Sequence, residues 1–173
     1  MARYRLRPAN EADEEFIRTL RRQNYMHNAP ILRIAGMTTQ EVIEAMDAWT
    51  ERSLAEMNKY DTVYTTIAET EEGEPVGYII VLWPAHDDFS QLPQGYVFDL
   101  GVKREHRGTG CAAMLLQHAE DFVRKQGGLF IALNVNAQNG RAVAFYKKHG
   151  YLEEWKMMGK CLVRPEDLEP SEG

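Results

Sequence analysis

The sequence predicts one globular domain of the α/β class, of the α+β type. Short runs rich in β-branched and aromatic residues alternate with longer segments in which apolar residues recur about every 3.6 positions. A glycine-containing turn, HRGTG at 106–110, joins one such strand to one such helix. With 173 residues, of which 44% are hydrophobic, the chain is long enough to bury one sizeable core.

The N-terminal half predicts a strand, two helices and a hairpin. Residues 4–7 alternate in polarity and form the first expected strand. Asn10 is expected to cap a helix that runs to about residue 26, because the acidic residues after it favour the positive end of a helix. Thr38 or Thr39 is expected to begin a second helix that reaches about Lys59, because apolar residues recur along it with a helical period. The β-branched run 62–69 and the apolar run 75–83, joined by TEEGE, predict a hairpin.

The C-terminal half predicts a loop, three strands and two helices, in one domain over 1–163 with a polar tail over 164–173. The polar, proline-containing segment 84–95 is long for a connection and is expected to be a functional loop. The remaining expected elements are a strand over 96–102, a helix from the glycine turn to Gly127, a strand over 129–135, a short helix capped by Asn139 and a last strand over 155–163.

Composition excludes several classes of function. The net charge of −6 argues against a nucleic-acid surface. The apolar run 76–83 is too short for a membrane helix, and the first residues lack the apolar region of a secretory signal. Two cysteines and five histidines show no metal-ligand spacing. We therefore expect a cytoplasmic protein without metal, membrane or nucleic-acid partners, and a homodimer is left open.

The glycine turn can be read in two ways. Gly108, Gly110 and Ala113 match G-x-G-x-x-A of a dinucleotide-binding fold. That fold requires the first glycine directly after a strand and an acidic residue about 20 positions later. Here five residues separate Val102 from Gly108, and the next strand ends in asparagine rather than a carboxylate. Both conditions fail, which disfavours a nicotinamide-dependent enzyme.

The second interpretation takes Arg107, Gly110 and Ala112 as an anion-binding turn. The N-terminus of a helix offers unpaired N–H groups and partial positive charge, and the glycines allow close approach of the backbone to a phosphate. Arg107 adds a charge and Thr109 a hydroxyl.

Residues 96–151 resemble the GNAT superfamily of N-acetyltransferases. Arg107, Gly110 and Ala112 match its R/Q-x-x-G-x-G/A motif, which binds the pyrophosphate of acetyl-CoA. A second motif follows a helix and a strand later, in the same order as in the family. It matches Asn139, Ala142, Phe145, Tyr146, Gly150 and Tyr151.

This resemblance implies a GNAT fold, a single mixed and mostly antiparallel twisted sheet with helices on both faces. It also implies transfer of an acetyl group from acetyl-CoA to a primary amine of a small molecule, peptide or protein. The residues expected to bind acetyl-CoA are Leu100, Gly101, Val102, Arg107, Gly108, Thr109, Gly110, Cys111, Ala112, Asn139, Ala142 and Tyr146. Cys111 falls on the apolar stripe of its helix, which favours a small core residue over a reactive thiol.

Tyr146 is the expected general acid for the departing thiolate, because a phenol and a thiol have similar reference pKa values. A packing role on the helix is the alternative. The general base is less defined. Asp99 is the nearest carboxylate, but strict alternation places it on the opposite face of its strand from Tyr96 and Phe98. Glu69, His86 and a water relay stay open.

The acceptor is expected to meet Tyr96, Phe98 and an acidic rim. The rim comprises Asp87 and Asp88 in the HDD segment, together with Glu41, Glu44 and Asp47. Such carboxylates attract a cationic amine, although solvated surface charge is an equal alternative. Family members often carry Glu or His at the positions of Tyr96 or Phe98, and their absence here supports a second hypothesis, a non-catalytic acyl-CoA-binding domain.

Overall fold

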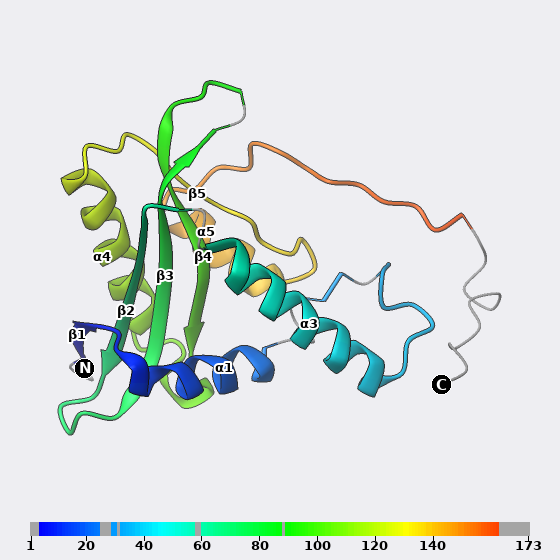
Figure 1. The fold of residues 1–173 in the computed structure, drawn as a ribbon, viewed down its shortest axis with the longest axis horizontal. Helices are drawn as coiled ribbons and strands as arrows, with labels where there is room; N and C mark the ends of the chain where they lie inside the picture. Colours follow the sequence, from blue (N-terminus) through cyan, green and yellow to red (C-terminus); the bar gives the residue numbers. More distant parts are fainter. Residues whose placement is uncertain (1–3, 25–28, 31, 58–59, 88, 163–173) are drawn as a thin grey trace. The chain divides into compact units, whose positions relative to one another are not determined.

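The structure, a computed structural model, describes residues 4–24, 29–30, 32–57, 60–87 and 89–162 (Figure 1). The chain divides into two compact units. Unit 1 comprises residues 1–21 and 54–134, and unit 2 comprises residues 22–53 and 135–173. The division into one domain and a tail stays a prediction, and the tail lies outside the described residues.

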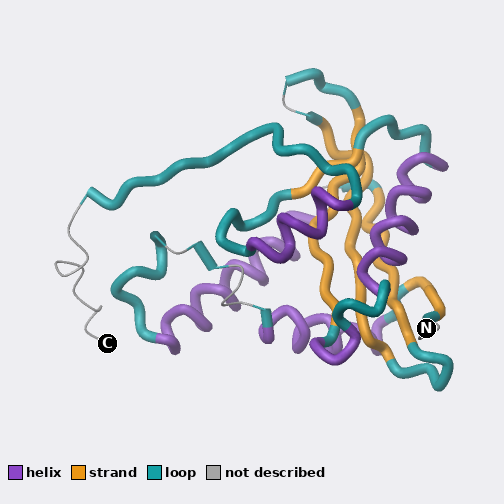
Figure 2. The backbone as a smooth tube through the Cα atoms, turned by 180° about the vertical axis from the view of Figure 1, so that it is seen from behind, coloured by secondary structure: helices purple, strands orange, loops and turns teal. Residues whose placement is uncertain are grey.

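A five-stranded sheet organises unit 1, with its strands in chain order (Figures 1 and 2). The first four strands pair antiparallel and the last pair is parallel, so the sheet is mixed and mostly antiparallel, as expected. The strands are β1 (Arg5–Pro8), β2 (Thr62–Glu69), β3 (Pro75–His86), β4 (Pro93–Val102) and β5 (Ile131–Leu133).

Helices cover both faces of this sheet. Leu20 of α1 (Glu14–Gln23) packs with Ile67, Tyr78 and other side chains on one face. A Cβ placed on Gly77 would meet Leu115 of α4 (Cys111–Lys125), so α4 lies on the opposite face. Neighbouring residues of a strand point to opposite faces, so Gly77 faces α4 and the next residue, Tyr78, faces α1.

Unit 2 contains most of α3 (Thr39–Met57) and all of α5 (Gly140–Lys148). Its own small core joins Ala29, Val42 and Met46, with Ile34 and Met37 packed against them. Thr38 begins α3 as expected, because its backbone N–H donates to Glu41 (2.6 Å) while its hydroxyl accepts from the Glu41 N–H (3.3 Å).

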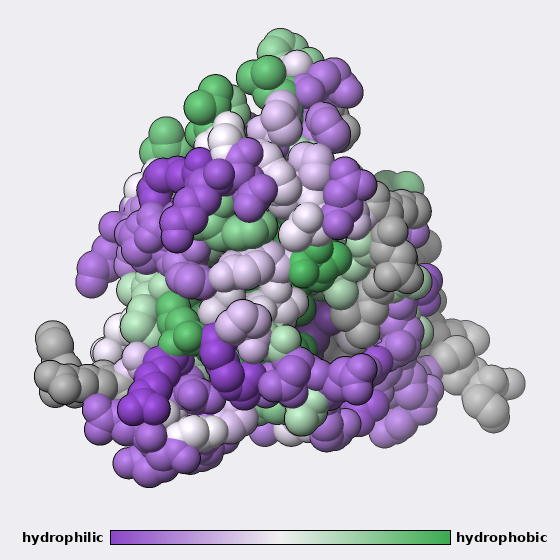
Figure 3. Space-filling view, turned by 60° about the vertical axis from the view of Figure 1, so that its left-hand side comes forward, coloured by the Kyte–Doolittle hydropathy of each residue, from purple (hydrophilic) through white to green (hydrophobic). Residues whose placement is uncertain are grey.

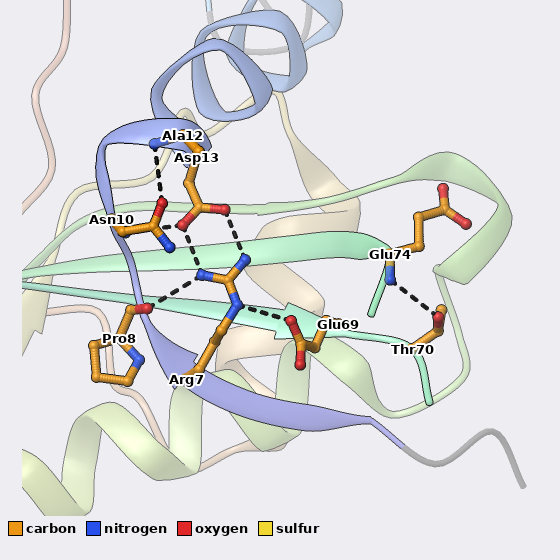
Figure 4. Close-up of polar contacts among 8 residues, drawn as sticks. All are labelled: Arg7, Pro8, Asn10, Ala12, Asp13, Glu69, Thr70 and Glu74. Carbon is orange, nitrogen blue, oxygen red and sulfur yellow. Dashed lines mark hydrogen bonds and ion pairs between the residues drawn. The ribbon is translucent and has the colours of Figure 1, made fainter. Parts of the chain in front are cut away.

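Arg7 of β1 forms hydrogen bonds with Asp13 and with Glu69, as Figure 4 shows. Its two terminal nitrogens donate to the carboxylate of Asp13 at 2.7 and 2.8 Å, and its Nε donates to Glu69 of β2 at 2.7 Å. Asn10 caps the 3-10 turn η1 (Glu11–Asp13), where Asp13 also accepts from the Asn10 backbone N–H. We call Arg7, Asp13 and Glu69 the Arg7 cluster; it joins β1, η1 and β2.

Two expected elements differ from the structure. The segment 84–95 is not a long loop, because β3 and β4 extend into it and pair Ala85 with Gln94 and His86 with Pro93. The last strand expected over 155–163 is absent from the described residues 155–162. An alternating sequence forms a strand only where a partner strand bonds its backbone. Side chains of this segment such as Trp155 and Met157 are exposed.

Candidate functional site

The glycine turn presents the N-terminus of α4. Gly108 and Gly110 have φ of +80° and +95°, a region that other residues rarely adopt, so the sequence needs glycine at both positions. Gly110 is the N-cap and no side chain caps the helix there. Within the helix, the first bond runs from Met114 N to Gly110 O at 3.0 Å, so the three amides before Met114 have no intrahelical acceptor.

Side chains of the turn fix its shape. Arg107 Nε donates to the carbonyl of Val102 at 3.1 Å, which ties the turn to the end of β4. Thr109 Oγ1 donates to the carbonyl of His106 at 2.6 Å. A guanidinium and a helix N-terminus therefore occur together directly after β4, which suits a phosphate.

Cys111 is a core residue rather than a reactive one. It opens α4 and is 1% exposed. Burial raises the pKa of the Cys111 thiol to about 11, so the thiol stays protonated at neutral pH. The contact with acetyl-CoA that the sequence predicts for Cys111 would therefore come from its backbone amide.

The edge of β4 that faces away from β3 is paired over a short length only. β5 runs alongside Gly95–Val97 and ends at Leu133. Beyond that point, Asp99–Val102 pair with β3 alone among the described strands. Leu100 and Val102, whose main chain was expected to contact the coenzyme arm, lie in this segment.

A β-bulge in β4 changes the face of the sheet to which the residues after it point. Ile80 pairs with Asp99 while the next residue, Val81, pairs with Val97, so Phe98 is the extra residue. Alternation therefore breaks at Phe98. Asp99 lies on the α1 side of the sheet together with Tyr96 and Phe98, and the prediction that it points away from them is wrong.

Asp99 is held by two partners on the α1 side. Arg21 Nε lies 2.9 Å from Asp99 Oδ2, and the Tyr78 hydroxyl donates to the same oxygen at 2.9 Å. The Arg21 side chain is 5% exposed and that of Asp99 is 21% exposed. Burial raises the pKa of the Asp99 carboxyl, while Arg21 and the hydrogen bond from Tyr78 oppose the rise.

Sequence reasoning missed Arg21 and Tyr78. Arg21 follows Phe16, Ile17 and Leu20 on the apolar stripe of α1, and a charged residue on such a stripe signals a buried partner. Gly101 gives the second signal: a Cβ there would lie 2.6 Å from Cε1 of Tyr78. The glycine lets the tyrosine ring lie across β4 and reach Asp99.

Tyr96 and Phe98 line the same side of the sheet. Both pack against the cluster that contains Leu20 and Tyr78, and the Arg21 guanidinium lies 5.4 Å from the centre of the Phe98 ring. Burial raises the pKa of the Tyr96 hydroxyl, with the nearby Tyr60 adding to it and a hydrogen bond with Asn134 opposing it. These two side chains supply an aromatic surface next to Asp99.

Asp87 forms hydrogen bonds with the backbone of the hairpin tip between β3 and β4. Its carboxylate accepts from the backbone N–H groups of Phe89 and Ser90, each at 3.1 Å. Phe89 and Leu92 of the same tip are 91% and 45% exposed, and Figure 3 shows hydrophobic surface at the top of the molecule, where this tip lies. Asp88 lies outside the described residues.

The three acidic residues expected on the second helix also have local partners. Glu41 accepts from Thr38, Glu44 accepts from Gln40 at 2.7 Å, and Asp47 pairs with Arg22 at 2.9 Å. The Asp47 charge is therefore balanced within unit 2. Of the other base candidates, Glu69 belongs to the Arg7 cluster and His86 is exposed at the end of β3.

In unit 2, the second motif forms the start and core of α5. Asn139 caps the helix as expected, accepting from the Ala142 N–H at 3.1 Å. The Tyr146 ring is half-buried between two aromatic neighbours, with ring centres 5.2 Å from Phe145 and 5.7 Å from Tyr151 in edge-to-face contacts. Packing thus fixes the Tyr146 ring without burying it fully.

The described residues contain no group of three or more His, Cys, Asp or Glu side chains able to hold a metal ion. No helix within the described ranges is both long enough and apolar enough to cross a membrane.

Comparison with known proteins identifies the family. The model of the acetyltransferase (GNAT) family matches residues 34–151, which include the turn and both motifs. The chain belongs to the GNAT acetyltransferase family. This confirms the resemblance drawn from the sequence and the fold class expected from it.

Individual GNAT relatives are similar to parts or all of the chain. An N-alpha-acetyltransferase of Caenorhabditis elegans is 33% identical over 82 residues, 47% of this chain and 44% of that protein. The chain thus matches less than half the length of this relative. A putative acetyl transferase from Pyrococcus furiosus has a TM-score of 0.69 with 22% identity, covering 92% of this chain and 100% of that one. Aminoglycoside N-acetyltransferase AAC(6′)-Iy, solved in complex with CoA, has a TM-score of 0.64 with 18% identity, covering 94% and 97%.

Proposed function

We propose that the protein is an N-acetyltransferase that moves an acetyl group from acetyl-CoA to a primary amine of a small molecule, peptide or protein. The uncapped N-terminus of α4 behind Gly108 and Gly110 carries this proposal, because it joins unpaired amides, positive φ glycines and Arg107 in a GNAT chain. The N-alpha-acetyltransferase and aminoglycoside acetyltransferase relatives support an amine acceptor.

Acetyl-CoA is the proposed co-substrate. The backbone amides from Gly108 to Ala112 and the guanidinium of Arg107 would hold its pyrophosphate. Thr109 would contribute its backbone amide, because its hydroxyl donates to the His106 carbonyl. The backbone of Leu100, Gly101 and Val102, along the part of β4 that β5 does not pair, would hold the pantetheine arm and thioester. The resemblance to the family also assigns acetyl-CoA binding to Asn139, Ala142 and Tyr146, which match the second motif.

The reaction we propose is direct attack. The amine nitrogen forms a bond to the thioester carbonyl carbon, and the negative charge that develops on the carbonyl oxygen is stabilised by a backbone N–H of β4. When the intermediate collapses, the C–S bond breaks and the thiolate of CoA accepts a proton from the Tyr146 hydroxyl. Tyr146 then regains a proton from solvent. The amine gives up one proton, which passes through a base to solvent, so atoms and charge balance over the cycle.

Asp99 is the proposed acceptor of that proton, directly or through water. Burial raises the pKa of its carboxyl, and a carboxyl of raised pKa is a better base near neutral pH. Arg21 and Tyr78 hold Oδ2 and so fix the orientation of the carboxylate beside Tyr96 and Phe98, the proposed acceptor-binding residues. Glu69 is a weaker candidate because it pairs with Pro75 at the start of β3, whereas Tyr96 pairs with Leu82 further along that strand.

One observation favours a second function. The ion pair between Arg21 and Asp99 occupies the nearest carboxylate, which is what a non-catalytic acyl-CoA-binding domain without a working base would also show. Release of free CoA in the presence of an amine separates the two functions, because a binding domain releases none.

Replacement of Tyr146 by Phe tests the catalytic proposal. The ring contacts with Phe145 and Tyr151 remain, so folding and acetyl-CoA affinity are expected to stay the same. The maximal rate is expected to fall by roughly 10²–10⁴-fold, since general acid catalysis is lost. The rate is measured as CoA release against a panel of amines.

The matched control is Tyr151→Phe, which removes a hydroxyl from the neighbouring ring of the same aromatic group and is expected to keep its rate. Full turnover by Tyr146→Phe, in conditions where the chemical step limits the rate, would contradict the role of Tyr146. Absence of CoA release by the wild-type protein with every amine would favour the binding domain.

A further inference from the structure

Three residues of unit 1, Tyr4, His106 and Thr109, form a closed loop of hydrogen bonds at the glycine turn. The hydroxyl of Tyr4, just before β1, lies 3.0 Å from Nδ1 of His106 and 2.8 Å from Oγ1 of Thr109. Thr109 Oγ1 in turn bonds the His106 carbonyl at 2.6 Å. The rings of Tyr4 and His106 meet edge to face, with centres 5.8 Å apart. The start of the chain is thereby joined to a turn more than 100 residues later.

The proton on each hydroxyl fixes the direction of this loop of hydrogen bonds. Thr109 has one hydroxyl proton, which it donates to the carbonyl of His106. The bond between Tyr4 and Thr109 must then use the proton of Tyr4. Since Tyr4 has no second proton, His106 Nδ1 must carry a hydrogen and donate it to the tyrosine oxygen.

This direction leaves Nε2 of His106 available to a ligand. In a neutral imidazole with hydrogen on Nδ1, Nε2 is an acceptor; in the imidazolium both nitrogens are donors. Charging His106 therefore leaves the loop of hydrogen bonds intact and adds an N–H donor and a positive charge beside Arg107. Both additions favour a phosphate oxygen.

We infer that Tyr4 is a positioning residue that holds His106 so that its Nε2 binds a phosphate group of CoA. The inference rests on the proposed function, since it assumes that this turn takes CoA. Its ligand chemistry is the pyrophosphate diester, which Arg107 and the α4 amides are proposed to share.

Charged side chains near His106 come from three segments of unit 1. From the turn between β2 and β3, Glu74 interacts electrostatically with His106, but Lys103 binds its carboxylate at 2.6 Å. Within its own segment, Arg104 and Arg107 are positive and Glu105 is negative; on β1, Arg5 follows Tyr4. The pyrophosphate supplies the negative charge that balances this basic segment.

The test measures the affinity of dephospho-CoA by calorimetry at pH 6 and pH 8. This probe lacks the phosphate monoester of CoA, which itself titrates near pH 6, so the charge on the ligand stays constant. Histidines as a class change charge between pH 5 and 8. The wild-type protein is expected to bind about fivefold more tightly at pH 6, because only the charged imidazole carries a hydrogen on Nε2 that can be donated to a phosphate oxygen.

Two variants are compared with the wild-type protein. Tyr4→Phe keeps the ring contact and removes the hydroxyl; it is expected to weaken binding at pH 6 about threefold or more and to reduce the difference between the two pH values. His106→Asn keeps an N–H donor near the Nδ1 position but cannot become charged, and it is expected to bind equally at both pH values.

The matched control is Tyr64→Phe. The Tyr64 hydroxyl also pairs with a histidine, His118 Nε2 at 2.7 Å, but on β2 and α4 away from the turn, and its loss is expected to leave the affinity unchanged. Wild-type affinity and pH dependence in folded Tyr4→Phe would overturn the inference alone. Should that variant fail to fold, retention of the pH dependence by His106→Asn overturns it. A wild-type protein that binds no dephospho-CoA at either pH would overturn the proposed function as well.

Discussion

Gly110 occupies a backbone conformation with φ of +95° at the point where α4 begins, and no other atoms lie within 4 Å of a Cβ placed there. A side chain at this position would therefore extend into open space next to the start of α4. We expect Gly110→Val to weaken acetyl-CoA binding by about 2 kcal/mol or more, because the side chain covers the amides and strains φ. Calorimetry of the folded variant with CoA measures this loss.

The control for this prediction is Gly73→Val in the turn between β2 and β3. Gly73 has φ of +86° and equally open surroundings, so valine there causes similar backbone strain without touching the glycine turn. Its CoA affinity is expected to equal that of the wild-type protein. Equal affinities for wild type, Gly73→Val and Gly110→Val would show that the turn does not hold the ligand.

The sequence predicted the turn at Gly110 and the helix cap at Asn139, because both depend on local backbone geometry. It placed Asp99 on the wrong face because a bulge at Phe98 depends on how β4 pairs with β3, and alternation within one strand carries no trace of that pairing. Arg21 and Tyr78 were missed for a related reason, since their partner comes from another element.

At the scale of elements, the Arg7 cluster connects β1, η1 and β2. Asp13→Asn is expected to lower the free energy of unfolding by about 2 kcal/mol at pH 7, since it removes a charged partner from a largely buried pair. The hydrogen bonds from Arg7 lower the pKa of the Asp13 carboxyl below its usual value. This stabilisation is complete above the unfolded pKa of about 3.9 and is lost as the pH falls through the lower folded value.

Urea unfolding at pH 7 and at pH 3 measures both parts of this prediction, and the difference between wild type and Asp13→Asn should shrink at the lower pH. Glu14→Gln is the control, because the exposed pair of Glu14 with Arg18 should contribute no more than about 0.5 kcal/mol. A cost for Asp13→Asn no larger than that of Glu14→Gln would contradict the role of the Arg7 cluster.

The order of elements could be predicted further than their ends. Helix caps are local signals. Asn10 and Asn139 cap where the sequence placed them, and Thr38 is the one of the two candidate threonines that caps α3. The sequence did not predict that β3 continues past Trp83 or that β4 begins before Tyr96. Paired strands can continue past a proline when a change of register accommodates it. The strand expected over 155–163 shows the reverse case, an alternating segment without a described partner.

At the scale of the whole molecule, the net charge of −6 favours cationic acceptors. If Asp87 and Asp88 attract the acceptor, a diamine should be preferred over a matched monoamine, and this preference should fall as salt rises, because charges are screened beyond about 8–10 Å at ordinary ionic strength. Specificity constants for both amines at low and high salt test this. Asp87→Asn/Asp88→Asn should reduce the preference, and asparagine can still accept the Phe89 N–H bond that shapes the tip.

Glu71→Gln/Glu72→Gln is the control for this experiment. It changes the net charge by the same amount in the turn between β2 and β3, where both side chains are exposed. The diamine preference is expected to survive in this variant. An equal preference in both double variants and in wild type, at both salt concentrations, would leave the hairpin carboxylates without a part in acceptor choice.

The two outermost strands of the sheet are its shortest. β1 has four residues and β5 has three, against eight to twelve in the strands between them. Short edges offer few free backbone groups to a strand of another molecule, which is how natural sheets resist edge-to-edge aggregation. If the protein does form a homodimer, β1 and β5 are therefore poor places for its subunits to join, and the long apolar strand β3 stays protected at the centre because it is paired on both sides.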